Sequence, residues 1–401
     1  MTRHLISARI LFAMLVFLPF QLIAAQALPL PLYDVPKKEA SQDKAPTSDG
    51  WMEDFLQKIG ADGEFNPDKA IDISVLPGPF YNPEMSLGVG VSAIGLYQVD
   101  PNDTVSELSS LIINGFASVN GSVGVVIENK TFLNEDRQRF YFNIQLTDAP
   151  DVYYGVGYTD NHVDDNKIDY NYQQFSANPM WLQRLNDKSF AGIGFDFNYS
   201  SGGHFDSADS SVDYSELAES SRSVGANILI NYDSRDYVLN PSDGRLLQMN
   251  SYLYRQFLGS KTDFEVYDLM YSEYMPIAGY SDVLAWQVRT RLTHGDVPWD
   301  QLSKVGGGNL LRGYNIGRYR DKQMLLAQVE YRMDLTGRHG MVFWSGIGMV
   351  AEQIGDFSSD EILPSNGLGY RFEVKPRVNL RLDLAFANSE TGFYFNVNEA
   401  F

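Results

Sequence analysis

The chain has 401 residues, a formal net charge of −20, 13% aromatic residues and no cysteine. The excess of acids argues against binding nucleic acid through a general basic surface. The absence of cysteine excludes disulfides, thiolate metal sites, a cysteine nucleophile and a lipoprotein anchor, and a hydrophobic fraction of 44% excludes a disordered acidic chain. The length fits two or three soluble domains or one large all-β unit.

Residues 1–27 have the three parts of a secretory signal peptide. Arg3 and Arg9 form a positive start, residues 10–25 are apolar, and Ala25 and Ala27 define a small-x-small cleavage site. An uncleaved membrane anchor is the alternative, but the apolar run is short for one. Cleavage removes two bases, so 31 − 2 = 29 bases and 51 acids leave a net charge of −22. An exported chain without a later apolar helix is either soluble or an outer-membrane β-barrel.

Residues 28–80 are predicted to form a periplasmic linker. The first part is rich in proline and then in charge, which is typical of a flexible tether. Trp51, Phe55 and Ile59 recur at every fourth position and predict a short amphipathic helix over residues 51–59. This helix would plug the barrel mouth, lie on the inner membrane face, or be a marginal helix on a tether.

Residues 81–401 are predicted to form one all-β domain, because the hydrophobic period changes to two. The alternating segments are long enough, at ~3.3 Å per residue and ~45° tilt, to cross the ~25 Å apolar band of an outer membrane. We therefore predict a 16-stranded antiparallel transmembrane β-barrel. The strands are expected at 86–97, 106–119, 122–132, 136–147, 151–160, 168–184, 188–200, 222–235, 245–257, 262–276, 282–294, 322–335, 340–351, 366–375, 377–387 and 391–401.

The lengths of the connections predict which end of the barrel faces outward. Transmembrane barrels have short periplasmic turns and long outer loops. With the C-terminus in the periplasm, the expected long outer loops are 201–221, 293–321 and 352–365. The expected periplasmic turns are 120–121, 148–150, 185–187, 236–244, 276–282, 336–339 and 376.

The longest connection carries a motif. Residues 306–314 read Gly-Gly-Gly-Asn-Leu-Leu-Arg-Gly-Tyr, and a Glu-Tyr-Arg sequence follows at 330–332. A Tyr-Asp-Ser-Arg-Asp sequence stands upstream at 232–236, and the chain ends in Ala-Phe. Together these motifs resemble the bacterial surface antigen family, the BamA/TamA-type barrels that assemble or translocate proteins at the outer membrane. The resemblance covers about residues 80–401.

The resemblance implies that this loop folds back into the lumen as a lid. It implies the lid residues Gly307, Gly308, Leu311, Arg312, Gly313 and Tyr314, and a pair between Arg312 and Glu330 on the inner wall. By strand parity Glu330 also points inward, and a buried guanidinium needs a carboxylate. In the alternative, Arg312 lies in a solvated outer loop and Glu330 pairs with Arg332 or Arg371.

Two departures from the family pattern stand out. Gly346 occupies a position where the family often has a wall aspartate, so the lid arginine must rely on Glu330 or another inward acid. In addition, too few residues precede the first predicted strand for a periplasmic POTRA module, so the chain resembles the short members of the family.

Other polar and apolar residues form two further groups. Arg332, Arg371, Glu373, Arg381 and Asp383 are expected inside the barrel, as an electrostatic constriction or as plain wall salt bridges. Phe393, Phe395, Val397 and Phe401 share one face of the last predicted strand and form its C-terminal β-signal. The histidines are dispersed and no catalytic motif occurs, so we expect no enzymatic activity, metal or cofactor. The acidic loop 206–219 would be solvated or bind divalent cations.

We therefore predict a barrel in the outer membrane of a Gram-negative bacterium that inserts or translocates proteins. The seam is expected between the first and last predicted strands, 87–97 and 391–401, where Gly88, Gly90 and Gly95 would weaken pairing. A passive pore or a lipid-associated structural barrel is the alternative. The expected partners are outer-membrane lipids or lipopolysaccharide and unfolded outer-membrane proteins, with no nucleic acid; a homo-oligomer is a further candidate.

Overall fold

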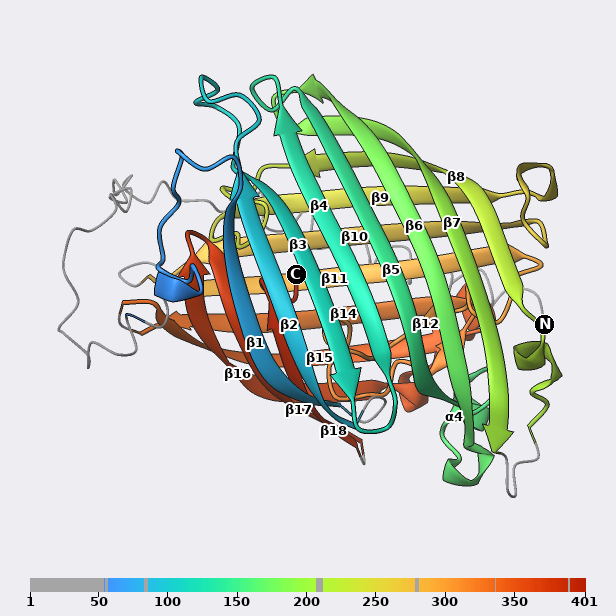
Figure 1. Ribbon diagram of the computed structural model, residues 1–401. Coiled ribbons are helices and arrows are strands. Elements are labelled where there is room, and N and C mark those ends of the chain that lie inside the picture. Colours follow the sequence, from blue (N-terminus) through green and yellow to red (C-terminus); the bar gives the residue numbers. More distant parts are fainter. Residues whose placement is uncertain are drawn as a thin grey trace, which may run out of the picture. The chain divides into compact units, whose positions relative to one another are not determined.

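The computed structural model describes residues 54, 57–82, 86–206, 212–277, 281–335, 337–388 and 390–401, without the side chains of residues 80–82. In this part of the chain, sixteen strands form one antiparallel barrel (Figure 1). The fold class predicted from the hydrophobic period is therefore correct. Residues 1–27 and most of the predicted helix 51–59 lie outside the described residues; Asp54, Gln57 and Lys58 are helical. No helix in the described part is long and apolar enough to span a bilayer.

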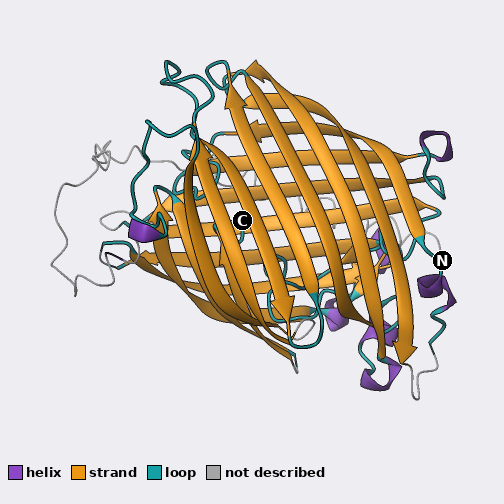
Figure 2. Cartoon of the chain, viewed as in Figure 1, coloured by secondary structure: helices purple, strands orange, loops and turns teal. Residues whose placement is uncertain are grey.

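Each barrel strand pairs with the next one along the chain, and the short helices lie in the connections at the ends of the strands (Figure 2). The barrel strands are β1 (Asp72–Asn82), β2 (Ser86–Tyr97), β3 (Ser109–Ser118), β4 (Val123–Leu133), β5 (Gln138–Tyr153), β6 (Ile168–Asn186), β7 (Ser189–Asp206), β8 (Ser221–Asp233), β9 (Gly244–Tyr254), β10 (Phe264–Pro276), β11 (Val283–Gly295), β14 (Gln323–Asp334), β15 (His339–Ala351), β16 (Leu363–Lys375), β17 (Val378–Ala387) and β18 (Glu390–Val397). The connections contain β12 (Ser303–Lys304), β13 (Arg320–Asp321), α4 (Tyr158–Asn161), η1 (Asp164–Asn166), η2 (Ser215–Ala218), η3 (Gln256–Leu258), η4 (Ile354–Asp356) and η5 (Ser359–Glu361).

The predicted number of strands is correct, but it results from two errors that cancel in the count. The barrel begins with β1 at Asp72, inside the segment predicted to be linker. Conversely, residues 138–153 form the single strand β5, although a turn at 148–150 and a separate strand at 151–160 were predicted. Asp148 and Pro150 suggest a turn in the sequence, yet both pair with residues of β6. One missed strand and one strand split in two leave the total at sixteen.

This correction reverses the direction of the strands before β5. We call the end where β1 begins and β18 ends the base, and the opposite end the loop end. Counting from β1, the β3–β4 turn lies at the loop end, so the prediction that residues 120–121 lie with the periplasmic turns is wrong. From β6 onward, the predicted and observed directions agree. Four long connections, β5–β6, β7–β8, β11–β14 and β15–β16, lie at the loop end, whereas the β2–β3 connection, which is as long as β15–β16, lies at the base.

Side chains alternate between an apolar outer face and a largely polar interior. On β17, Leu384 and Phe386 are exposed, whereas Arg381 and Asp383 are buried. Strand length varies around the barrel: β6 has 19 residues and β7 has 18, whereas β17 has 10 and β18 has 8. The shortest strand of the wall is therefore β18, which borders β1.

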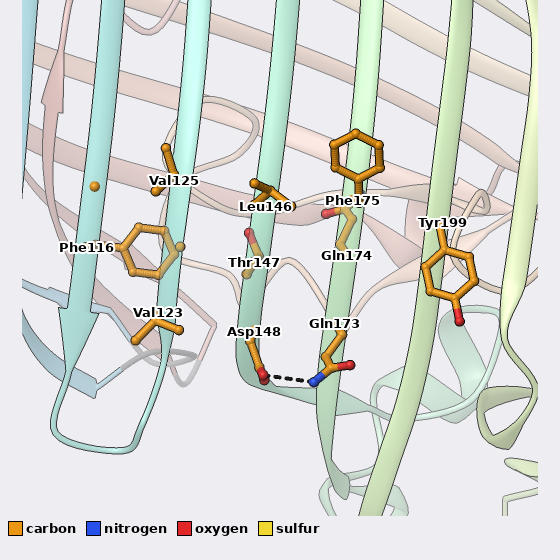
Figure 3. Close-up of a pocket in the computed structure, with 12 residues that line it drawn as sticks. Phe116, Val123, Val125, Leu146, Thr147, Asp148, Gln173, Gln174, Phe175 and Tyr199 are labelled. Atoms are coloured by element: carbon orange, nitrogen blue, oxygen red, sulfur yellow. Dashed lines mark hydrogen bonds between the residues drawn. The ribbon is translucent and has the colours of Figure 1, made fainter.

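A shallow groove of about 660 Å³ crosses the outer face from β3 to β7 (Figure 3). The register aligns one row of its outward residues, Gly115, Val125, Leu146, Phe175 and Tyr199. In the next row toward the loop end, the Gln173 side-chain amide donates to the Asp148 carboxylate at 2.8 Å. On β5 and β6 the outer face thus changes from apolar to polar between these rows, as expected at a membrane interface.

Candidate functional site: the lid and the seam

The connection between β11 and β14, which we call the lid, folds back against the inner wall. Its ends pair as the two-stranded sheet β12–β13. An added Cβ on Gly306, which has φ +113°, would lie 2.6 Å from the Tyr314 carbonyl oxygen, and one on Gly313, with φ +111°, would lie 3.0 Å from Ala387. These backbone angles and close approaches explain the glycines of the motif. The lid residues Val305, Leu311, Tyr314 and Tyr319 pack with the wall residues Met324, Leu326, Val350 and Leu363.

Arg312 lies at the centre of the lid contact with the wall, and its side chain is fully buried. One guanidinium nitrogen donates to Asp383 at 2.7 Å, and another donates to Glu330. Both carboxylates are also fully buried, and the guanidinium carbon lies 3.7 Å from the centroid of the Trp344 ring. Asp383 on β17 supplies the second carboxylate that the glycine at position 346 does not. Sequence reasoning included Asp383 among the inward residues but did not identify it as a partner of Arg312.

The two carboxylates connect the lid to a larger charge network. Glu330 also accepts from Arg332 at 3.0 Å, and Asp383 also accepts from Arg371 at 2.6 Å. Arg381 holds the lid backbone, because its guanidinium donates to the Gly308 carbonyl at 3.0 Å. Four of the five residues predicted for the lumen network therefore surround the lid.

The contacts described for Glu373 lie outside this network. This residue lies at a register shift in β16, between Glu373 and Lys375. There its backbone N–H donates to the Arg338 carbonyl at 2.8 Å, and its carbonyl accepts from the Arg338 side chain at 2.6 Å. Glu373 still pairs with Asn379 in the register of Arg371 and Arg381, so the shift breaks the alternation only for the residues that follow Glu373.

The lid also binds the inner face of the last strand. The Glu390 carboxylate accepts from the Asn315 backbone N–H at 2.6 Å and from Arg318 at 3.0 Å. Farther along β18, the Tyr394 hydroxyl accepts from the Gly313 backbone N–H at 3.1 Å. Lid residues thus hold β18 from inside the barrel, in addition to its pairing with β17.

The end of the chain turns into the barrel, contrary to the predicted β-signal. Phe393, Phe395 and Val397 lie in β18, but the strand ends at Val397 and Asn398 has a φ of 66°. Phe401 is therefore not on the outer face. Its carbonyl accepts from Arg332 at 2.8 Å, and its ring packs near Tyr274. The preceding Glu399 accepts from Arg371 at 2.8 Å. Buried arginines in the lumen need such acceptors, and the left-handed residue makes the turn possible.

The seam between β1 and β18 is almost unpaired. Within the described residues, the two strands share one register pair, Tyr81 with Phe393, whereas β1 pairs with β2 along its whole length. The Val75 N–H donates to the Ile59 carbonyl at 2.8 Å, away from β2. By parity, the backbone nitrogens of Pro77 and Pro79 also face away from β2, toward β18. Proline has no N–H, so this edge of β1 lacks two hydrogen-bond donors.

This arrangement corrects the predicted position of the seam. The first strand of the barrel is β1, and the predicted residues Gly88, Gly90 and Gly95 lie in β2. All three have register partners in both β1 and β3. The prolines of β1, rather than the glycines of β2, therefore limit pairing at the seam.

Glu107 lies in the connection between β2 and β3 at the base, and its carboxyl group is expected to make the stability of the barrel depend on pH. Its carboxylate accepts from the Val238 backbone N–H at 2.9 Å, and burial raises the pKa of Glu107 from its ordinary 4.5 to about 7. Asp233 adds to this rise, whereas Arg139 and Arg235 oppose it. Since the folded pKa is raised, ionisation destabilises the folded state as the pH rises from about 4.5 to about 7. Glu107→Gln is expected to raise the Tm at pH 8 but not at pH 4; an equal shift at both would contradict this.

The comparisons with known proteins agree with this architecture. A model of the Omp85 superfamily domain matches residues 116–401, which include the lid, the charge network and β18. A search of the curated proteins gave no match. Among solved structures, the chain is similar to BamA from Haemophilus ducreyi lacking POTRA domains 1–3, with 13% identity, a TM-score of 0.51 and coverage of 82% of this chain and 69% of that one. It is also similar to CdiB from Escherichia coli, with 9% identity, a TM-score of 0.54 and coverage of 83% and 62%.

Proposed function

Since the chain belongs to the Omp85 superfamily, we propose that it is an outer-membrane barrel that inserts or translocates proteins through the seam between β1 and β18. The single register pair at this seam carries the proposal. An unpaired strand edge is a template for an incoming strand, which would add to β1 or β18 by β-augmentation. Unfolded outer-membrane proteins are the proposed clients, and lipopolysaccharide and other outer-membrane lipids the proposed surroundings.

The height of the wall supports the same proposal. The 8 residues of β18, at ~3.3 Å per residue and ~45° tilt, span roughly 19 Å, less than the ~25 Å apolar band of a typical outer-membrane barrel. A bilayer that adapts to a short wall becomes thinner there. Thinning beside the seam would lower the barrier that a client strand meets when it enters the membrane.

A reversible disulfide crosslink across the seam tests the proposal. The chain has no native cysteine, so Tyr81→Cys with Phe393→Cys introduces one disulfide at the register pair. In liposomes, the oxidised variant is expected to lose insertion of an unfolded barrel client, and reduction is expected to restore it. Val288→Cys with Ala327→Cys, at a register pair of β11 and β14, is the matched control. Full insertion with the seam locked would refute the proposal.

A passive pore or a structural barrel is the second candidate. The fully buried Arg312 speaks against an open pore, because the lid rests on the wall in this structure. Solute flux measured in the same liposomes separates the two candidates: flux without client insertion would favour the pore. We propose no enzymatic activity for either.

A further inference from the structure

The lower part of the β1 edge lies beyond the end of β18. Antiparallel register from the pair Tyr81–Phe393 places Val397, the last residue of β18, opposite Pro77. The edge of β1 from there to Asp72 therefore extends past β18 toward the base. Residues 59–65 lie along this part of the edge: the Val75 N–H donates to the Ile59 carbonyl at 2.8 Å, and the Ser74 hydroxyl donates to the Gly60 carbonyl at 2.6 Å.

The same segment also binds strands on the far side of the seam. The Gly63 N–H donates to the Val374 carbonyl of β16 at 3.1 Å. Arg338, in the β14–β15 turn, donates to the Ala61 carbonyl at 2.6 Å. Residues 59–65 thus bridge β1 to β16 across the base of the seam.

A buried ion cluster reinforces this bridge. The Lys375 side chain is fully buried, and its ammonium lies 2.7 Å from both the Asp62 and the Asp72 carboxylates. It also donates to the Glu64 carbonyl at 2.6 Å. One cation of β16 therefore joins residues 59–65 to β1. Removal of this cation would leave Asp62 without its cation and Asp72 with only Lys69, at 2.8 Å.

Packing fixes the segment in one conformation. Ala61 is fully buried in an apolar cluster that includes Leu76 of β1 and Val378 of β17. Gly60 has a φ of +74°, and an added Cβ there would overlap the Ile73 carbonyl oxygen. A larger residue at position 60 cannot be accommodated without displacement of the segment from β1.

We propose that residues 59–65 are a staple that closes the base of the seam in place of the missing end of β18, and that release of this staple opens the seam. The staple occupies the β1 edge that an incoming strand would need. A pull on the chain before residue 59 would release it. That the seam opens to admit a client strand rests on the proposed insertion function. Whether the seam opens at all is measured separately, without a client.

Gly60→Val tests the staple. Gly121→Val, which has a similar φ of +88° but open space around the added side chain, is the matched control. The full chain in lipid nanodiscs would carry spin labels at exposed positions of β1 and β17, Val75 and Leu384. Gly60→Val is expected to speed hydrogen exchange of the β1 edge by tenfold or more and to widen the distance distribution between the labels; Gly121→Val is expected to change neither.

A second variant covers the case in which Gly60→Val fails to fold. Lys375→Met removes the shared cation and is expected to give the same two changes, whereas Lys322→Met, which removes the surface pair with Glu352, is expected to give neither. Faster exchange with an unchanged label distance would overturn the proposal, because the segment would then be an ordered tether. A wider seam without client insertion would instead refute the proposed function and leave the staple intact.

Discussion

Arg312→Met is expected to release the lid, raise the conductance of the barrel and lower its stability. The substitution removes the cation that Glu330 and Asp383 share, and leaves each of them with one arginine, Arg332 and Arg371 respectively. Loss of one member of a buried ion pair costs about 3–5 kcal/mol when an uncompensated charge remains, so the two arginines that stay in place should hold the cost near the lower end of that range. The stacking of the guanidinium on Trp344 is lost as well. Conductance in planar bilayers and the Tm of the reconstituted barrel measure the two effects.

Two further variants separate the charge from the lid. Arg312→Met combined with Glu330→Gln and Asp383→Asn also takes a carboxylate partner from the buried Arg332 and Arg371, so it is expected to lower the stability further while the conductance stays as high as in Arg312→Met. Arg245→Met, which removes an exposed arginine paired with Glu273, is the control and is expected to change neither quantity. Wild-type conductance and Tm in Arg312→Met would remove Arg312 from the lid role.

The regular parts of the barrel were predictable because alternation is a local property of the sequence. In β14 and β17, apolar and polar positions alternate, and this repeat places Glu330 and Asp383 on the inner wall. Alternation does not say which inward residues meet across the lumen. The contact of Arg312 with both β14 and β17 depends on the path of the lid, which only the folded chain shows.

The failures share a physical cause, a backbone feature that a period of two does not encode. The prolines of β1 indicate a chain without strand structure, although they fit an edge whose N–H groups face an unpaired seam. The register shift at Glu373 and the left-handed Asn398 each break the alternation for the residues that follow. Parity therefore predicts the direction of a side chain only up to the first such irregularity.

The interior of the barrel holds β18 more firmly than its neighbour β1 does. Near the loop end, Glu390 and Tyr394 bind the lid. At the base, the turned-in residues Glu399 and Phe401 bind Arg371 and Arg332. The loop end of β18 thus contacts the lid, and the residues that follow its other end bind the charge network around Arg312, so the lid and the seam are parts of one structure. Displacement of the lid would loosen β18 as well as open the lumen.

Pro77→Val combined with Pro79→Val is expected to close the seam and slow client insertion. The two valines supply N–H donors toward β18 at positions where β1 now has none, and valine fits a strand. Two hydrogen bonds of about 1 kcal/mol each correspond to a roughly 30-fold lower population of the open seam. Insertion rates in liposomes should fall by a similar factor, and hydrogen exchange of β1 should slow. Pro179→Val, in β6 of the closed wall, adds a donor away from the seam and should leave insertion unchanged. Insertion at the wild-type rate, with β1 protected from exchange, would mean that clients do not enter between β1 and β18.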